Sequence, residues 1–288
     1  MTELAKPFEM LGKPFSDAIV AGNATKADLL RERGIVPRLA IVRVGDSGDD
    51  YSYEQQIIKR APLSGIEALA YDLDGNISQT DLEDTIRKLS ADRKIHGIIL
   101  MRPLPKRFDE ASAIACIDPA KDIDGATDQS KVFLYSGRGK GFYPCTAEAA
   151  VLLLKYYGIK LEGARAAVVG RSETVGKAAA LLLLKENATV TVCHSRTGDL
   201  ASALKECDVV VAAAGKPKLV TGECIKEGAA VVDVGYNILD DGTVSGDVDF
   251  DAAWEKKCAV TPVPRGLGNA TVAVLMRHLI RACEEEIG

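Results

Sequence analysis

The segment from Ala164 to Gly176 has a residue pattern that could bind a phosphate group. An apolar run, Ala166 to Val169, stops at Gly170, and Gly176 opens a stretch of helix-forming residues. This order is typical of a strand, a tight turn and a helix, whose free N–H groups and positive dipole end attract phosphate oxygens. The spacing of the glycines differs from the usual three-glycine dinucleotide fingerprint. A plain strand-to-helix turn therefore stays open as the alternative.

The end of the next apolar run indicates which cofactor such a turn would hold. Residues 188–193 are followed by His194, Ser195, Arg196 and Thr197. NAD enzymes usually carry an acid at this point, where it binds the ribose hydroxyls. This chain has no acid there, and it adds Arg171 in the first turn; guanidinium groups pair well with phosphate oxygens. The local chemistry favours NADP over NAD, with a solvated basic loop as the alternative interpretation.

The composition excludes several other classes of function. The chain has 288 residues, of which 47% are hydrophobic, so one or two globular domains are expected. Its net charge of −5 argues against a nucleic-acid or membrane partner, and no apolar run approaches the roughly 20 residues of a membrane span. Seven cysteines without a C-x-x-C pair and three widely separated histidines indicate reduced thiols, a cytoplasmic protein and no metal site.

Short apolar runs alternate with helical patterns along most of the chain. In the second half, strands are expected over residues 164–170, 188–193, 208–213, 229–234 and 258–263. In the first half they are expected over 38–44, 66–73 and 95–101, with helices over 51–64 and 78–91. A glycine-rich stretch, 136–142, predicts a mobile connection. The fold class predicted is α/β: two three-layer α/β domains, the second Rossmann-like with a parallel sheet, and a cleft between them.

A series of short motifs, spread over most of the chain, has a specific order and spacing. The motifs are Val44-Gly45-Asp46, Tyr53, Arg102 to Pro105, Lys121 to Gly125, Pro144 to Thr146, Gly170 to Ser172 with Val175 and Gly176, His194 to Thr197, Asp233 to Gly235 with Asn237, Gly246 to Val248, and Thr261 to Pro264. Each motif alone is weak. Together they resemble one family, the methylenetetrahydrofolate dehydrogenase/methenyltetrahydrofolate cyclohydrolases.

The resemblance implies an oxidoreductase of folate one-carbon metabolism. Such an enzyme oxidises methylene-tetrahydrofolate to methenyl-tetrahydrofolate with NADP, and a cyclohydrolase step then adds water to the methenyl cation. A folate-binding catalytic domain is implied over residues 1–144 plus 272–288, and a Rossmann NADP-binding domain over 145–271. The implied partners are tetrahydrofolate substrates and a second copy of the chain, forming a homodimer through the Rossmann domain.

The resemblance also assigns site residues. It implies catalytic roles for Tyr53 and Asp124, the latter accepting hydrogen bonds from the amino and ring N–H groups of the pterin. Folate contacts are implied for Tyr53, Met101, Pro103, Asp124, Pro264, Gly266 and Gly268. Cofactor contacts are implied for Gly170, Arg171, Ser172, Val175, Gly176, His194, Ser195, Arg196, Thr197, Ala214, Gly215, Gly235, Asn237 and Thr271.

Two positions depart from the family together. The family carries Tyr-x-x-x-Lys on one helix face, and here Ile57 stands at the lysine; the glutamine that bonds this lysine is Met101. Lys59 lies about 240° around the helix from Tyr53 and cannot replace the lysine. Hydrolysis of the methenyl cation needs a tuned lysine, whereas hydride transfer depends mainly on positioning. We therefore predict a dehydrogenase whose cyclohydrolase activity is lost or much reduced.

Two alternatives stay open beside this prediction. One is a fully bifunctional enzyme with a rerouted proton path, and the other is a non-catalytic paralogue that binds folate or nucleotide. Further departures are Glu173, a negative charge in the phosphate turn, and Arg265, Asn269 and Ala270 in the loop after Pro264. Substrate contacts are expected to differ at that loop.

Overall fold

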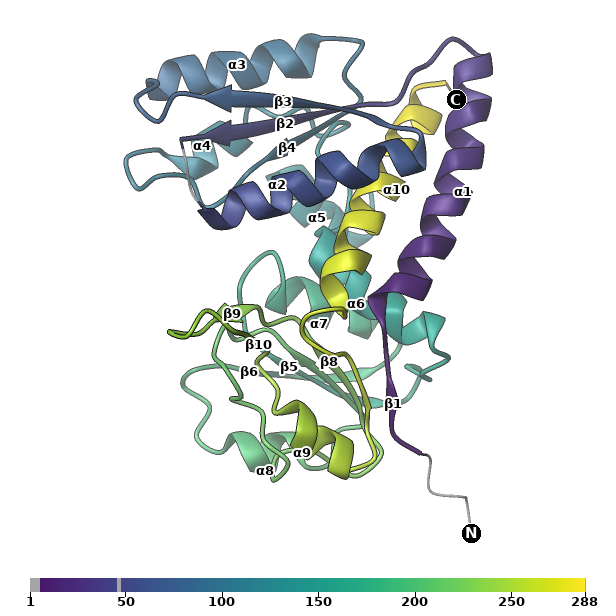
Figure 1. Ribbon diagram of the computed structural model, residues 1–288, viewed down its shortest axis with the longest axis vertical. Helices are drawn as coiled ribbons and strands as arrows, with labels where there is room; N and C mark the ends of the chain where they lie inside the picture. Colours follow the sequence, from purple (N-terminus) through teal and green to yellow (C-terminus); the bar gives the residue numbers. More distant parts are fainter. Residues whose placement is uncertain (1–5, 46–47, 288) are drawn as a thin grey trace. The chain divides into compact units, whose positions relative to one another are not determined.

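The computed structural model (Figure 1) describes residues 6–45 and 48–287. Asp46, which belongs to one of the motifs above, lies outside these residues. The chain divides into two compact units: unit 1 comprises Met1–Ser16 and Thr146–Thr271, and unit 2 comprises Asp17–Cys145 and Val272–Gly288. In the described part of the chain, no helix combines the length and the apolar character needed to cross a membrane.

Unit 1 is built on a parallel sheet. Six strands among the described residues pair in the order β1-β11-β8-β7-β5-β6. They are β1 (Phe8–Glu9), β5 (Arg165–Val169), β6 (Thr189–Cys193), β7 (Val209–Ala212), β8 (Ala230–Asp233) and β11 (Ala259–Val260). The strands predicted for the second half are confirmed. Their Val/Ala runs form strands because the central ones are buried on both faces.

The connections of this sheet create a topological switch point. From β5 the chain passes through α7 (Gly176–Lys185) to β6 on one side, then through α8 (Leu200–Leu204) to β7 on the other side. A short hairpin, β9 (Asn237–Ile238) with β10 (Val244–Ser245), and helix α9 (Phe250–Glu255) precede β11. Ligands of such sheets gather at the carboxyl ends of the strands beside the switch point. Here these are the ends of β5 and β7.

The N-terminal strand belongs to unit 1. β1 pairs with β11 in parallel, with Phe8 opposite Ala259, and the Met10 N–H donates to the carbonyl of Val260 at 2.9 Å. The sequence analysis placed this segment with the first-half domain. The structure places it with the sheet of the second half, because a strand of two residues is held by a partner about 250 positions away and leaves no local signal.

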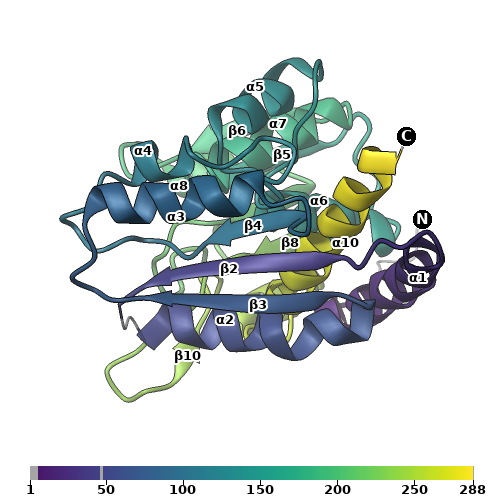
Figure 2. The ribbon, with the colours of Figure 1, turned by 90° about the horizontal axis from the view of Figure 1, so that it is seen from above.

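Unit 2 is built on a smaller parallel sheet. Its strands are β3 (Glu67–Leu73), β2 (Arg38–Val44) and β4 (Gly97–Leu100), in that order, and all lie where the sequence predicts them. Helices α3 (Gln79–Ala91) and α4 (Glu110–Ile114) cover one face, and α2 (Gly48–Arg60), followed by a 3-10 turn (Ala61–Ser64), lies along the other (Figure 2). The α/β three-layer fold class is thereby confirmed for this unit.

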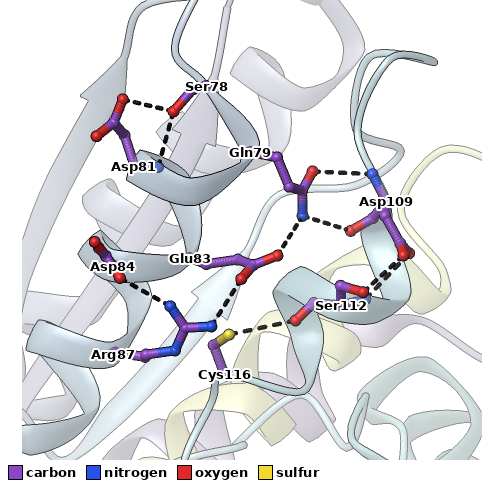
Figure 3. Close-up of polar contacts among 9 residues, drawn as sticks. All are labelled: Ser78, Gln79, Asp81, Glu83, Asp84, Arg87, Asp109, Ser112 and Cys116. Carbon is purple, nitrogen blue, oxygen red and sulfur yellow. Dashed lines mark hydrogen bonds and ion pairs between the residues drawn. The ribbon is translucent and has the colours of Figure 1, made fainter.

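Polar contacts fix the start of α3 and of α4 (Figure 3). Ser78 caps α3 by accepting from the Asp81 N–H at 3.0 Å, as its spacing predicts. Gln79 joins the two helices, because its amide donates to the carbonyl of Asp109 at 3.1 Å and accepts from the Asp109 N–H at 3.0 Å. Asp109 in turn caps α4 at Ser112. These contacts hold the starts of the two helices against each other.

Three further helices contribute to unit 2: α5 (Asp128–Ser136) lies wholly in it, and α1 (Gly12–Glu32) and α10 (Leu267–Ile287) lie in it for most of their length. Lys26 of α1 pairs with Glu284 of α10 at 2.9 Å. The stretch after α5, predicted to be mobile, is exposed over residues 138–140 and held at its C-terminal end. Phe142 is 1% exposed, and Arg281 of α10 lies over its ring and donates to the carbonyl of Gly141 at 2.6 Å.

Candidate functional site

The turn between β5 and α7 depends on its two glycines. Gly170 has φ 137°, and a Cβ there would collide with the carbonyl oxygen of Ala213, at the end of β7. A Cβ on Gly176 would collide with the carbonyl oxygen of Gly170. Ser172 accepts from the Gly176 N–H at 3.3 Å, which tightens the entry into α7. The predicted strand, turn and helix are present, and the backbone cradle they form suits a phosphate.

The basic groups lie at the same edge of the sheet. β5 and β6 are neighbours, with Val169 opposite Cys193, so Arg171 and the segment 194–197 both follow the carboxyl ends of adjacent strands. That segment is a fixed turn: Thr197 Oγ1 accepts from the His194 N–H at 2.9 Å, and His194 Nδ1 accepts from the Arg196 N–H at 3.1 Å.

The exposed side chains of this edge are available to a ligand. Arg171, Ser195 and Arg196 are exposed. The acid in the phosphate turn has a partner, because Glu173 pairs with Lys177 one helical turn on, at 3.6 Å.

Other predicted cofactor residues surround two buried acids that sequence reasoning had not singled out. The N–H groups of Ala214 and Gly215 donate to the side chain of Asp247, and the N–H of Gly235 donates to that of Asp233. Asn237 also donates to Asp247, at 3.0 Å. Both acids stand in motifs that carry the resemblance, which is the signal that could have identified them. The three backbone N–H groups therefore donate to side chains of the protein itself rather than to a ligand.

The loop before α10 carries the predicted residues Pro264 and Gly266, and the start of α10 carries Gly268 and Thr271. A Cβ on Gly266 would lie 2.5 Å from the carbonyl oxygen of Pro262, whereas one on Gly268 would meet nothing within 4 Å. Thr271 is buried and donates to the carbonyl of Leu267 at 3.3 Å.

Arg265, in the same loop, has an unusual backbone conformation. Its φ is 89°, a region that favours glycine. Its side chain is 3.5 Å from Glu9 in an exposed ion pair.

In unit 2, Asp124 forms an ion pair that the sequence analysis missed. Arg102 Nη2 donates to Asp124 Oδ2 at 3.0 Å, and the two side chains are 21% and 22% exposed. Burial raises the pKa of Asp124, and the Arg102 charge opposes this shift. Tyr53 lies in the same field: burial first, and then the Asp124 charge, raise its pKa well above the usual value. The predicted catalytic pair, Tyr53 and Asp124, is thus within electrostatic reach of one guanidinium.

The acids of the motif Lys121 to Gly125 have separate tasks. Asp122 is fully buried and accepts from the N–H groups of Ala126 and Thr127 at 2.9 and 2.8 Å, which shapes the turn before α5. Gly125 has φ 67°, and a Cβ there would lie 2.6 Å from the backbone of Tyr143. Only Asp124 of these two acids is partly exposed, so it is the one that can meet a ligand.

Ile57 and Met101 are buried on facing elements. The Met101 N–H donates to the carbonyl of Val42 at 2.8 Å, which extends β4, and strand alternation directs its side chain away from the α3 face toward the α2 face. On α2, Glu54 bonds Arg43 of that sheet face at 2.7 Å, and Ile57 follows Glu54 by three residues, on the same side of the helix. Ile57 is 0% exposed and Met101 4% exposed, and Pro103 beyond them is exposed.

Together these features define a class of protein: an α/β enzyme with one nucleotide-binding unit and a second unit that displays a paired carboxylate. The chain belongs to the tetrahydrofolate dehydrogenase/cyclohydrolase family, because residues 10–124 match its catalytic domain and residues 144–287 match its NAD(P)-binding domain. The family and the fold class predicted from the sequence are confirmed.

Relatives and solved structures agree over nearly the whole chain. The protein named "Bifunctional protein FolD" of Alkaliphilus oremlandii is 46% identical over 272 residues, covering 94% of this chain and 95% of the relative. The FolD crystal structure from Campylobacter jejuni has a TM-score of 0.94 at 36% identity, covering 97% of this chain and 99% of that one. The Trypanosoma brucei enzyme, complexed with NADP and an inhibitor, has a TM-score of 0.93 at 34% identity, covering 98% and 99%.

Proposed function

We propose that this chain oxidises methylene-tetrahydrofolate to methenyl-tetrahydrofolate with NADP. The observation that carries the proposal is the partly exposed Asp124 carboxylate, held by Arg102 in the unit that matches the family's catalytic domain. An ionised carboxylate accepts only, so it matches the adjacent N–H donors of a pterin. A pterin bound in this way would be oriented for hydride transfer, which depends mainly on positioning.

NADP fits the residues of unit 1. Gly170 and Gly176 allow the backbone of the turn to pack too closely for any Cβ, and Arg171 and Arg196 supply cations at the same sheet edge. When bound, the nicotinamide ring accepts the hydride. The Trypanosoma brucei relative was crystallised with NADP, which supports this choice. NAD is the alternative cofactor, and the family domain is described as NAD(P)-binding.

The cyclohydrolase step has two interpretations. The relatives at 40–48% identity carry the name bifunctional, which favours the bifunctional alternative over our first prediction of a lost activity. The buried apolar residues Ile57 and Met101, at the family's lysine and glutamine positions, favour the dehydrogenase-only enzyme. Hydrolysis in the bifunctional case would require a proton path that avoids both positions.

One assay separates these possibilities. Methenyl-tetrahydrofolate is followed by its absorbance while it forms from methylene-tetrahydrofolate with NADP or NAD, and then while it decays. Decay well above the buffer rate shows the bifunctional enzyme. Accumulation shows the dehydrogenase alone. A chain that forms no product with either cofactor would contradict the proposed oxidation and leave the non-catalytic paralogue.

If the product accumulates, the two apolar positions can be tested directly. Ile57→Lys alone should restore little hydrolysis, because burial lowers the pKa of a lysine that lacks a partner. Adding Met101→Gln supplies an acceptor, so the double variant should exceed the sum of the two single variants. Ile58→Lys, at the next position of α2, is the matched control and should gain nothing. Equal hydrolysis by the single lysine variant and the double variant would contradict the paired account.

Two further expectations stay proposals. The chain forms a homodimer through the NADP-binding unit, which light scattering of the purified protein tests. It acts in the cytoplasm, which localisation of a tagged full-length chain in its host cell tests.

A further inference from the structure

The motifs Asp233 to Gly235 and Gly246 to Val248 carry the family resemblance, yet their acids, Asp233 and Asp247, have no role in the chemistry above. They meet next to the end of β7. The Asp247 side chain is 0% exposed. It accepts from the N–H groups of Ala214, Gly215 and Lys216 at 2.5, 2.8 and 2.8 Å. Successive N–H groups that converge in this way form a nest, an arrangement that ordinarily binds an external anion.

Asp233 holds Asp247 in position. Its carboxylate is 3% exposed and accepts from the N–H groups of Gly235, Asp247 and Val248 at 2.8, 2.9 and 2.9 Å. Glycine is required beside each acid. A Cβ on Gly235 would collide with the Asp247 carboxylate, and one on Gly246 would collide with the Asp233 carboxylate. The two motifs are therefore one interlocked structure.

The location of this nest gives it a functional meaning. β7 is the neighbour of β5, and the Gly170 backbone touches Ala213, directly before the nest. The carboxyl edge of the sheet thus has two sets of backbone N–H groups, the turn 170–176 and the turn 214–216. The second is already filled by a carboxylate of the chain itself. Its N–H groups cannot take a phosphate, and its backbone can meet a ligand only through carbonyl oxygens, which accept from hydroxyl or amide donors.

We propose that Asp247 is a built-in anion that fills the nest of residues 214–216 and so positions this turn to accept hydrogen bonds from the donor groups of the bound dinucleotide. Those donors are the ribose hydroxyls and the nicotinamide carboxamide, and the phosphates go to the turn 170–176. Asp247 is a positioning residue, because it acts through the backbone it holds. The inference rests on the proposed use of NADP.

Asp247→Ala tests the proposal by removing the carboxylate while keeping the Cβ. Because three N–H groups lose their acceptor, NADP binding measured by calorimetry should weaken about tenfold or more. Sodium formate supplies the missing carboxylate in the space left behind and should restore a large part of the affinity, whereas sodium chloride of equal ionic strength should not. The KM for methylene-tetrahydrofolate should change little. Asp241→Ala, an exposed acid of the β9–β10 hairpin, is the matched control and should bind NADP as the parent does.

Two results would overturn the proposal: parental NADP affinity in Asp247→Ala, or a well-folded variant whose weakened affinity formate does not improve. If Asp247→Ala fails to fold, Asp247→Asn replaces it. Its amide offers one acceptor oxygen and turns donors toward backbone donors, so NADP binding should weaken and formate should not help. Parental affinity in that variant would also contradict the proposal.

Failure of the proposed function has a different signature. In that case the parent itself would bind no NADP. The filled nest is then tested without cofactor, because formate should raise the melting temperature of Asp247→Ala and leave the parent and Asp241→Ala unchanged. No rise in Asp247→Ala would overturn the inference independently.

Discussion

Asp124→Asn is the smallest change that tests the folate site. In the parent, the carboxylate pairs with Arg102 at 3.0 Å, and both side chains are about four-fifths buried, at 22% and 21% exposed. The amide keeps the shape but loses the charge and half of the acceptor capacity. Its NH2 group also faces donors, either those of the guanidinium or those of the pterin. Substrate recognition should therefore suffer much more than folding.

The magnitude follows from the kind of hydrogen bond that is lost. A hydrogen bond to a charged group contributes about 1.5–3 kcal/mol, which corresponds to roughly ten- to a hundredfold in kcat/KM. The assay is methenyl-tetrahydrofolate formation at saturating NADP. The kcat/KM for the folate should fall by this factor, and the KM for NADP should not change. Asp128→Asn, an exposed acid at the start of α5, is the control and should behave as the parent.

The pH profile separates the charge of Asp124 from its shape. Burial raises the pKa of Asp124, and Arg102 opposes that rise. Arg102→Leu removes the opposing charge, so the pKa of Asp124 increases further. Because recognition requires the ionised carboxylate, activity is lost as pH falls through this pKa. The acid limb of kcat/KM should therefore move to higher pH. A near-parental kcat/KM in Asp124→Asn, or an unmoved acid limb in Arg102→Leu, would refute the reasoning.

Three other predictions follow from single contacts. Arg171→Ala and Arg196→Ala should each raise the KM for NADP far more than that for NAD; equal efficiency of the parent with both cofactors would contradict this. Arg265→Gly should raise the free energy of unfolding in urea by about 1 kcal/mol, because φ 89° is strained for arginine; a decrease would count against strain. Burial raises the pKa of Asp233 to about 6, above its unfolded value of about 3.9. The folded state then binds more protons in this window, so this group makes stability rise as pH falls from 7 to 4. The difference in unfolding free energy between the parent and Asp233→Asn should change over that range, and a constant difference would contradict it.

Local patterns predicted the larger elements of the fold. β2 begins and ends where predicted, at Arg38 and Val44, because every residue after Arg38 is buried. The strands β1, β9 and β10 have two residues each and were not predicted. β1 exists through pairing with a distant segment and β9 and β10 through pairing with each other, and pairing leaves no periodicity in so short a run.

The candidate site, too, could be predicted only in part from the sequence. The glycines at 170 and 176 were recognised because a turn that touches another backbone requires glycine locally. Arg102 was missed, since an arginine before proline is ordinarily a solvated side chain. Folding brings it to Asp124, 22 positions away. The sequence placed Asp233 and Asp247 in motifs but did not predict their structural role. An acid that is buried and accepts from backbone N–H groups cannot be distinguished in the sequence from one that faces water.

Positions 57 and 101 show how burial constrains substitutions in pairs. The sheet face under α2 holds one buried ion pair, Arg43 with Glu54, whose side chains are 9% and 2% exposed. The same face holds the buried apolar residues Ile57 and Met101. A buried polar group without a partner costs free energy. A buried polar pair and a buried apolar pair both avoid that cost, because neither contains an unpaired polar group. The interface is thus charged where both partners are present and apolar where both are absent. A lysine or a glutamine introduced alone at either of these two positions would be a buried polar group without a partner, so a polar change at one position favours a polar change at the other.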